Sequence, residues 1–175
     1  MRLALAQLNP VVGDLQGNAE RILAAARSAS AEGATLLLTP ELSLWGYPPR
    51  DLLLQPARLA LQSAVLDGLV EQLDGLCSLL VGVALPCDDD RAPGLYSGIA
   101  LVEAKPDLLI NLAASPFDPG KPALRRQLAG QAARRLNCPV VYLNQVGGND
   151  ELVFDGSSLV AVSYTHLTLP TNREV

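Results

Sequence analysis

The sequence predicts an α/β protein whose sheets are covered on both faces. Short apolar runs of strand length alternate with amphipathic stretches of helix length along its 175 residues. The composition agrees, because 49% of the residues are hydrophobic and 18% are charged, which is typical of a globular chain with a substantial core. A chain of this length forms one domain of ordinary size.

The first elements are expected to be a strand, a helix and a second strand. Residues 2–8 form an apolar run that Asn9-Pro10 closes, which predicts a strand. Apolar side chains then recur at helical spacing over residues 14–32, and Gly33 ends that helix. The run at 35–39 has the continuous apolar character of a strand that is covered on both faces.

A proline-rich loop at 40–51 leads to a second helix, expected over residues 56–74. The side of that helix expected to face the core contains Leu59, Ala60, Ser63, Leu66, Val70 and Leu73. Residues 78–85 predict another buried strand, followed by a turn at 86–94 and a strand at 95–102.

The remaining elements are a strand at 107–113, a helix at 121–136 and strands at 140–145 and 151–162. Gly147-Gly148 predicts a turn between the last two strands. Four arginines of the helix are expected to form a solvated outer face, with an oligomer or inter-domain contact as the alternative: Arg125, Arg126, Arg134 and Arg135.

Two places interrupt this regular order. A few residues join the strands expected at 95–102 and 107–113, whereas a parallel crossover needs about a dozen residues and usually a helix. We therefore expect either a hairpin or a lost segment near residues 103–104. Residues 163–175 lack core periodicity and are expected to be a disordered, non-native-looking tail, which leaves 1–162 as the domain.

The composition excludes several classes of function. A net charge of −5 and a pI near 4.8 argue against binding to nucleic acid. No apolar run is long enough to cross a membrane, and three cysteines without a CxxC pair or a secretion signal favour a cytoplasmic protein. The single histidine, His166, leaves little for imidazole catalysis or zinc binding, and Asp88–Asp90 is expected to be a solvated turn without a metal.

Glu41 is the first candidate for chemistry, because it follows the buried strand at 35–39. Open α/β sheets bind ligands beyond the carboxyl ends of their strands. Leucine side chains and Trp45 beside it would withdraw the carboxylate from water and raise its pKa toward that of a general base. The alternative is a solvated loop residue that helps to end the strand.

The three cysteines are poor candidates for a nucleophile. Cys77 and Cys138 each precede a buried strand and are expected to pack as small apolar residues. Cys87 precedes the acidic run, whose negative charge would raise the pKa of its thiol and disfavour the reactive thiolate. A mechanism that needs a lysine has Lys105 and Lys121 to choose from.

Four stretches resemble a known family: PELSLWGYPPRDLL at 40–53, LAQLNPVVGDLQGN at 5–18, DLLINLAASPFDPGKPALRRQ at 107–127 and VVYLNQVGGNDELVFDGSS at 140–158. The family is the nitrilase, or carbon–nitrogen hydrolase, superfamily, and within it the N-terminal glutaminase domains of glutamine-dependent NAD synthetases. The resemblance implies a nitrilase-like αββα four-layer sandwich, here incomplete because a segment near 103–104 is missing.

The resemblance also implies hydrolysis of glutamine by a Cys–Lys–Glu triad, with ammonia passing to a C-terminal synthetase domain. That domain, expected outside this chain, would use ATP and magnesium to convert deamido-NAD to NAD, and the parent enzyme is expected to be a homo-oligomer. The glutaminase domain itself is expected to need no cofactor.

Carried over residue by residue, Glu41 matches the general base of this family. Ser115 and Lys121 match positions that hold the glutamine substrate, and a short polar side chain with a cation suits an amino acid's charged groups. Tyr47 is a candidate for the pocket wall. Without the resemblance, Lys121 would be taken as a solvated residue of the first helical turn.

The chain departs from the family pattern at the nucleophile. The family's lysine and its Cys-Glu-Asp motif belong in the stretch missing near residues 103–104, and neither occurs in the sequence. We therefore expect this chain to hydrolyse no glutamine. Two alternatives remain open: a stand-alone amidase of the same superfamily acting on a small amide, and a non-catalytic domain that acts in subunit assembly.

Overall fold

The computed structural model describes residues 1–84, 106–163 and 166–168. Among the helices in these ranges, none has the length and apolar character needed to cross a membrane. Several expectations concern residues outside the described ranges: the turn at 86–94, the strand at 95–102, the seam near 103–104, and the roles of Cys87, Asp88–Asp90 and Lys105.

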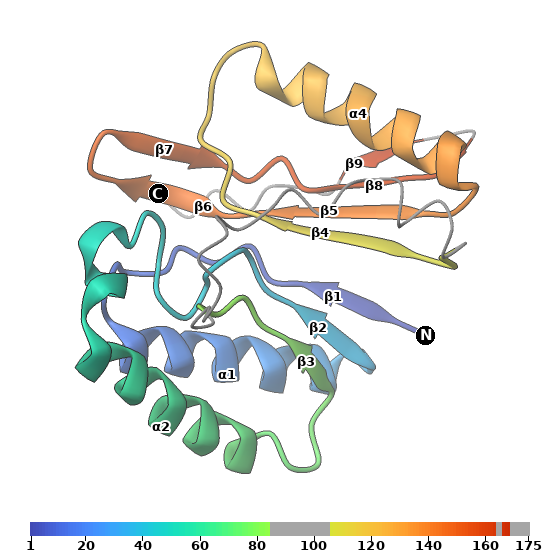
Figure 1. The fold of residues 1–175 in the computed structure, drawn as a ribbon. Helices are drawn as coiled ribbons and strands as arrows, with labels where there is room; N and C mark the ends of the chain where they lie inside the picture. The colour runs from blue at the N-terminus through green and yellow to red at the C-terminus, as the bar shows by residue number, and fades with distance from the viewer. Residues whose placement is uncertain (85–105, 164–165, 169–175) are drawn as a thin grey trace.

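The elements stack in the order helices, sheet, sheet and helix (Figure 1). Helices α1 (Leu15–Ala31) and α2 (Pro56–Gln72) cover the outer face of one sheet. Helix α4 (Lys121–Leu136) covers the outer face of the other, and the two sheets face each other. The αββα arrangement predicted by resemblance is confirmed.

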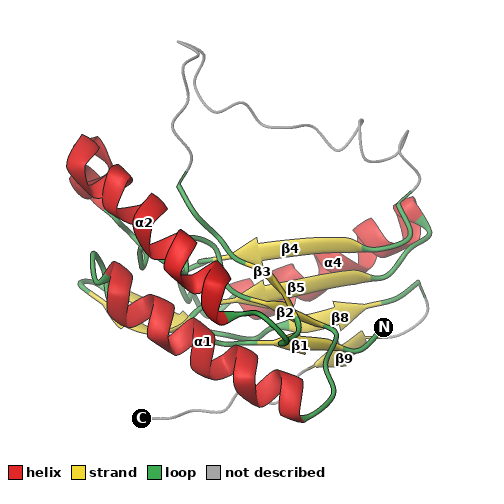
Figure 2. Ribbon diagram, turned by 90° about the horizontal axis from the view of Figure 1, so that it is seen from below, coloured by secondary structure: helices red, strands yellow, loops and turns green. Residues whose placement is uncertain are grey.

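The first sheet is parallel and contains β1 (Leu3–Leu5), β2 (Leu36–Leu38) and β3 (Ser78–Leu80), in that order. Helices α1 and α2 connect these strands, and Figure 2 shows the two helices side by side in front of the sheet. Helix α1 begins where the sequence predicts, because the Asp14 carboxylate accepts a hydrogen bond from Gly17 N in the first turn.

In the second sheet, β4 (Leu109–Ala113) is parallel to β5 (Val140–Asn144), and α4 joins them. Strands β8 (Leu159–Ala161) and β9 (His166–Thr168) follow as antiparallel neighbours in the order β4-β5-β8-β9. A separate hairpin of β6 (Val146–Asn149) and β7 (Leu152–Asp155) follows β5.

Three details of the strands after α4 differ from the sequence-based expectation. The single strand expected at 151–162 is split into β7 and β8, because Gly156 and Ser157 adopt positive φ angles of 64° and 49° that a strand does not accommodate. Gly147-Gly148, expected as a turn, lies in β6, and the turn instead falls at Asp150, whose φ is 50°. Three residues of the tail expected to be disordered form β9.

An apolar layer joins the two sheets. Leu38 of β2 is buried against Val141 and Leu143 of β5. Because side chains alternate along a strand, Val140 and Tyr142 face the other side, where they pack against α4. Strand β5 is therefore covered on both faces.

The buried side of α2 differs from the expectation. Ala60, Ser63 and Val70, expected in the core, are exposed. The buried residues are Gln62, Val65 and Leu69. Apolar residues occur on all sides of this helix, so its pattern alone does not identify the side that packs inward.

Gln62 is buried because its side-chain oxygen accepts the hydrogen bond of the buried Trp45 indole N–H. Trp45 is fully buried, and its Nε1 donates a hydrogen bond to Gln62 Oε1 at 2.6 Å. Gln62 Nε2 donates to Ala84 O at 2.8 Å, and Ala84 N donates to Gln62 Oε1 at 3.0 Å. One amide side chain thus ties together the loop after β2, helix α2 and the segment after β3.

Replacing Gln62 with methionine should lower the free energy of unfolding by about 2 kcal/mol, because the buried indole N–H and the Ala84 amide lose their acceptor. Gln72→Met is the matched control, since Gln72 is exposed and donates to Gly68 O within α2. Urea unfolding followed by tryptophan fluorescence measures both variants. Equal stability of the two variants would contradict the role assigned to Gln62.

Candidate functional site

The candidate site lies where the carboxyl ends of β2, β4 and β5 meet at one end of the sandwich. Glu41 follows β2, Ser115 follows β4, and Asn144 ends β5. Ala114 N donates a hydrogen bond across the two sheets to Glu41 Oε2 at 3.1 Å, although 73 positions separate the two residues in the sequence. The structure therefore brings the predicted base to the loop that contains Ser115.

Glu41 lies in a turn directly after β2, and it is exposed. Leu44 and Trp45 are fully buried in the cluster that includes residues of α1 and α2. They pack into the core beneath the turn, so the expectation that Trp45 withdraws the Glu41 carboxylate from water is wrong. The carboxylate is held instead by the Ala114 N–H from the other sheet.

Gly82 lets the chain after β3 pass closely under the turn that presents Glu41. A Cβ atom at Gly82 would lie 2.5 Å from Leu42 N and 2.7 Å from Pro40 O, which are backbone atoms that cannot easily move. Thr39 N donates to Leu80 O at 3.1 Å, which fixes the start of the same turn against β3. The position of Glu41 thus depends on the absence of a side chain at Gly82.

Asn144 holds the loop at Ser115 in place. Ser115 N donates to Asn144 Oδ1 at 2.8 Å, and Asn144 Nδ2 donates to Ser115 O at 3.1 Å. Asn144 is fully buried, and its backbone N donates to Ser158 Oγ at 3.0 Å. Sequence reasoning missed Asn144, although a polar residue at the end of the apolar run 140–143 is a signal that could have identified it.

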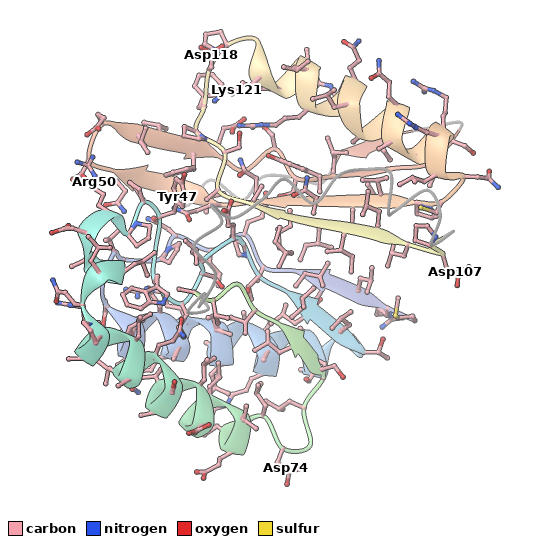
Figure 3. The ribbon with its side chains drawn as sticks, viewed as in Figure 1. Tyr47, Arg50, Asp74, Asp107, Asp118 and Lys121 are labelled. Atoms are coloured by element: carbon pink, nitrogen blue, oxygen red, sulfur yellow. The ribbon has the colours of Figure 1, made fainter. Side chains whose placement is uncertain are left out.

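Lys121 is the first residue of α4, and its Nζ donates to Pro116 O at 3.1 Å. Its charge therefore lies at the same loop as Ser115. A cation at a helix N-terminus is opposed by the helix dipole, so helix stability does not explain a lysine there. In Figure 3, Lys121 and Tyr47 lie at this end of the sandwich, and Asp107, which precedes β4, lies at the other.

Tyr47 lies against the β6–β7 hairpin, at the same end of the sandwich as the loop that contains Ser115. Its ring contacts Phe154 edge-on, with centroids 6.1 Å apart and an interplanar angle of 86°. Asn149 Nδ2 donates to Tyr47 O at 3.0 Å, and Arg50 pairs with Glu151 at 3.0 Å. The loop after β2 is thus held at two places. Tyr47 and Arg50 contact the hairpin, and Glu41 contacts the loop after β4.

The expectation that Arg125 belongs to a solvated face of arginines is wrong. Arg126, Arg134 and Arg135 are exposed, but Arg125 is only 8% exposed. Its Nη1 donates to Asp155 Oδ1 at 2.7 Å. Its Nη2 donates to Ser115 O at 2.7 Å, to Ser115 Oγ at 3.0 Å and to Pro116 O at 3.1 Å.

The buried arginine changes the ionisation of its neighbours. Burial would raise the pKa of Asp155, but hydrogen bonds from Ser157 and Arg125, with the charge of Arg125, outweigh it and hold that pKa below its ordinary value of 3.8. Burial raises the pKa of Tyr142 above 10.0, and the charge of Arg125 and a hydrogen bond with Ser115 offset only part of this rise.

Cys77 and Cys138 are buried free cysteines, as their expected packing role requires. Cys77 lies in a cluster with Ala26, Ala29 and Leu37, and its Sγ lies 3.8 Å from Ala26 O. Within the described ranges, no three His, Cys, Asp or Glu side chains come together in a way that could hold a metal ion.

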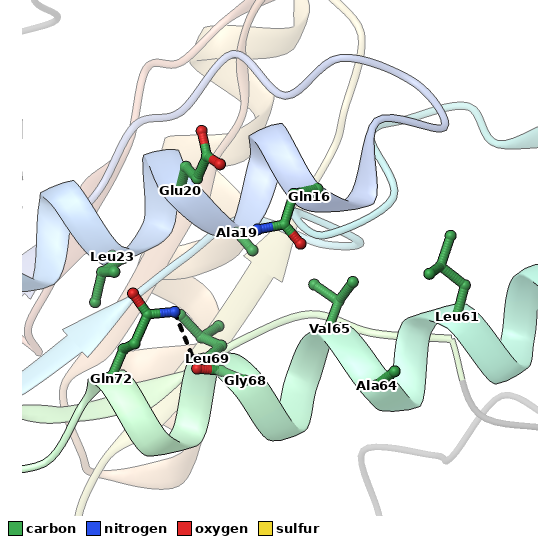
Figure 4. A pocket seen from close by; sticks show the side chains of 10 residues that line it. All are labelled: Gln16, Ala19, Glu20, Leu23, Leu61, Ala64, Val65, Gly68, Leu69 and Gln72. Atoms are coloured by element: carbon green, nitrogen blue, oxygen red, sulfur yellow. Dashed lines mark hydrogen bonds between the residues drawn. The ribbon is translucent and has the colours of Figure 1, made fainter.

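A cavity of about 310 Å³ lies apart from the candidate site, in the outer helical layer. Figure 4 shows the residues of α1 and α2 that line it: Gln16, Ala19, Glu20, Leu23, Leu61, Ala64, Val65, Gly68, Leu69 and Gln72. None of its lining residues belongs to the loops that meet at Glu41. The strand ends, and not this cavity, are therefore the candidate site.

Comparison with known sequences identifies the family. The sequence profile of the carbon–nitrogen hydrolases matches residues 2–112, which include Glu41 and strand β4 almost to its end. The chain belongs to the carbon–nitrogen hydrolase family. The match covers the first sheet with its helices α1 and α2 and extends into β4, the first strand of the second sheet.

This carbon–nitrogen hydrolase is similar to glutamine-dependent NAD(+) synthetases. The Synechocystis sp. enzyme is 33% identical over 235 aligned positions, which cover 92% of this chain and 42% of the relative. The Thermotoga maritima enzyme is 31% identical over 219 positions, which cover 91% of this chain and 38% of the relative. The chain thus spans about two fifths of the length of these curated relatives.

Solved structures agree on the fold of this carbon–nitrogen hydrolase. The glutamine-dependent NAD+ synthetase of Acinetobacter baumannii matches with a TM-score of 0.81 and 24% identity, covering 96% of this chain and 43% of that one. An amidase from Nesterenkonia sp. matches with a TM-score of 0.71 and 23% identity, covering 97% of this chain and 86% of that one.

The alignments also bear on the segment expected to be missing. The 235 positions aligned with the Synechocystis enzyme exceed the 175 residues of the whole chain. The 219 positions aligned with the Thermotoga enzyme exceed them as well. These relatives therefore have residues inside the aligned region that this chain lacks, and the chain is an internally shortened carbon–nitrogen hydrolase.

Replacing Gly82 with alanine should lower the free energy of unfolding by about 2 kcal/mol, because the added methyl group overlaps the backbone of the turn that presents Glu41. The control is Gly68→Ala in α2, where a Cβ would meet no atom within 4 Å and alanine favours the helix. Urea unfolding compares the two. A Gly82→Ala variant as stable as Gly68→Ala would contradict the close approach.

Replacing Asp155 with asparagine should make the free energy of unfolding depend less steeply on pH in acid. A carboxylate whose pKa is lowered by folding stabilises the protein above its ordinary pKa, and this contribution is lost as the pH falls through the pKa of the folded state. Wild-type stability should therefore fall more steeply than that of Asp155→Asn below about pH 4. Urea unfolding at a series of pH values tests this, and parallel curves would refute it.

Proposed function

We propose that this chain corresponds to the glutamine-hydrolysing, ammonia-supplying domain of a glutamine-dependent NAD synthetase, and that it binds glutamine without hydrolysing it. The contact between Ala114 N and Glu41 Oε2 is the observation that supports this most strongly, because it joins the proposed base to the proposed substrate loop. The proposal takes residues 1–162 as the domain and places the protein in the cytoplasm.

The proposed roles follow from charge and reach. Lys121 supplies a cation for the α-carboxylate of glutamine, and the Ser115 hydroxyl supplies a short polar partner beside it. Glu41 faces the same loop and corresponds to the base that would take a proton from a cysteine thiol in the intact family site. Tyr47 forms the neighbouring wall with the hairpin.

The chain lacks the nucleophile that this chemistry needs. The Cys-Glu-Asp motif of the family is absent, and the aligned relatives have residues inside this region that the chain does not have. As the resemblance implies, ATP and magnesium act in the synthetase part of the parent enzyme. The resemblance further implies glutamine, the synthetase domain and further copies in a homo-oligomer as partners of the parent domain.

Calorimetric titration tests the binding proposal. L-Glutamine should bind the chain, and D-glutamine should bind at least about tenfold more weakly because its charged groups cannot all meet Ser115 and Lys121. Lys121→Met should weaken L-glutamine binding about tenfold, whereas Arg126→Met, which removes an exposed charge from the same helix, should leave it unchanged. No glutamate should form above a boiled control.

Two other results would redirect the assignment. Binding of a simple amide such as butyramide, without binding of L-glutamine, would favour the stand-alone amidase. Absence of binding to either ligand, together with stable association of the chain with an intact synthetase, would favour the assembly domain. Glutamate released by the purified chain would contradict the absence of a nucleophile.

A further inference from the structure

We propose that Arg125 is a positioning residue for the glutamine site: anchored by Asp155, its guanidinium fixes the loop at Ser115 and Pro116, which the Ala114 amide joins to Glu41 and the Lys121 ammonium joins to α4. The ligand in this inference rests on the proposed function, but the fixed loop does not. Arg125 touches neither the reacting atoms nor the Glu41 carboxylate in the contacts described above, so it acts through the loop.

One guanidinium joins two segments that are far apart in sequence. The Arg125 side chain is 7% exposed and the Asp155 side chain is 16% exposed, so solvent screens this ion pair little. Nη1 is directed at the end of β7, and Nη2 is directed at three oxygen atoms of Ser115 and Pro116. The ring of Tyr142 lies below the guanidinium, with its centroid 6.0 Å away.

Stability alone does not explain a buried arginine here. A buried ion pair often contributes no more than well-packed apolar side chains of similar size, because both charges lose their hydration. Arg125 also leaves its Nε without a hydrogen-bond partner in the structure. What an apolar residue cannot provide is a rigid fork with donors aimed in two directions, and Arg125 uses both.

The loop passes this constraint on to the candidate site. Ser115 O accepts from Arg125 Nη2 and from Asn144 Nδ2, so two buried side chains fix one carbonyl. The adjacent Ala114 N is then directed at Glu41 Oε2. Without Arg125, Ser115 would keep its bonds with Asn144 but lose the donor to its hydroxyl and one of two donors to its carbonyl.

Pro116 O connects Arg125 to the substrate cation. It accepts from Arg125 Nη2 at 3.1 Å and from Lys121 Nζ at 3.1 Å, so both cations converge on one oxygen. The charge of Arg125 is compensated by Asp155, so Lys121 supplies the positive charge that favours an anionic group of the ligand.

The test compares Arg125→Met, Arg125→Lys and the exposed control Arg126→Met in the full chain. Amide hydrogen exchange measured by NMR reports on the loop through Ala114 and Ser115, and on the sheet through Val141 and Leu143. Calorimetric titration with L-glutamine reports on the site. Lysine keeps the charge and can pair with Asp155, but its single ammonium cannot span both segments, so it separates charge from geometry.

Both Arg125 variants should lose about tenfold of the exchange protection at Ala114 and Ser115 and bind L-glutamine about tenfold more weakly, with β5 amides unchanged. Arg126→Met should match the wild type. Three results would each overturn the positioning role. The first is wild-type exchange at Ala114 and Ser115 in either Arg125 variant, and the second is an equal loss of protection throughout β5. The third is full glutamine affinity in Arg125→Lys. If Arg125→Met fails to fold, Arg125→Lys decides.

The two proposals fail in different ways. If the wild-type chain binds no glutamine but the Arg125 variants lose protection only at Ala114 and Ser115, the proposed function fails and the positioning role stands. If the wild type binds glutamine and the Arg125 variants keep both affinity and loop protection, the positioning role fails and the proposed function stands.

Discussion

The packing of Leu38 against Val141 and Leu143 is the interaction on which the candidate site depends. Strands β2 and β5 run parallel to their neighbours β1 and β4, so the carboxyl ends of each parallel pair lie at one edge of its sheet. Face-to-face packing through these apolar side chains brings both carboxyl ends to the same end of the sandwich. The contact between Glu41 and Ala114 is a consequence of this arrangement, because neither sheet alone contains both residues.

Beyond the strand ends, buried polar side chains replace the hydrogen bonds that a sheet would supply. Backbone groups that leave a ladder still need partners, and burying a polar side chain is favourable only when its atoms are paired. Asn144 pairs with both backbone groups of Ser115, and Gln62 pairs with both backbone groups of Ala84. Arg125 serves the carbonyls after Ala114 in the same way. These polar residues mark where a loop is held in one conformation.

The sequence predicts the elements whose pattern is local, and it fails where burial depends on distant residues. The helix expected at 121–136 matches α4, and the αββα arrangement follows from the motifs. Arg125 resembles its charged neighbours in sequence, and only Asp155, 30 residues later, makes its burial favourable. Likewise, Trp45 is near Glu41 in sequence, yet its indole is buried in the core, where it donates a hydrogen bond to Gln62. The position of Glu41 after a buried strand makes it a candidate, whereas Ser115 and Lys121 become candidates only through motif resemblance, since their types alone predict solvated residues equally well.

The described cysteines lie at the wrong ends of their strands to complete the site. Cys138 precedes β5, whereas Asn144 ends it, and a strand rises about 3.3 Å per residue, so the strand keeps them roughly 20 Å apart. Cys77 likewise precedes β3, and Gly82 approaches the Glu41 turn from the strand's other end. A change of side-chain rotamer brings neither thiol to Glu41. The contacts described for Glu41, Ser115 and Lys121 all join residues within the described ranges, so the proposed site keeps its geometry without the nucleophile.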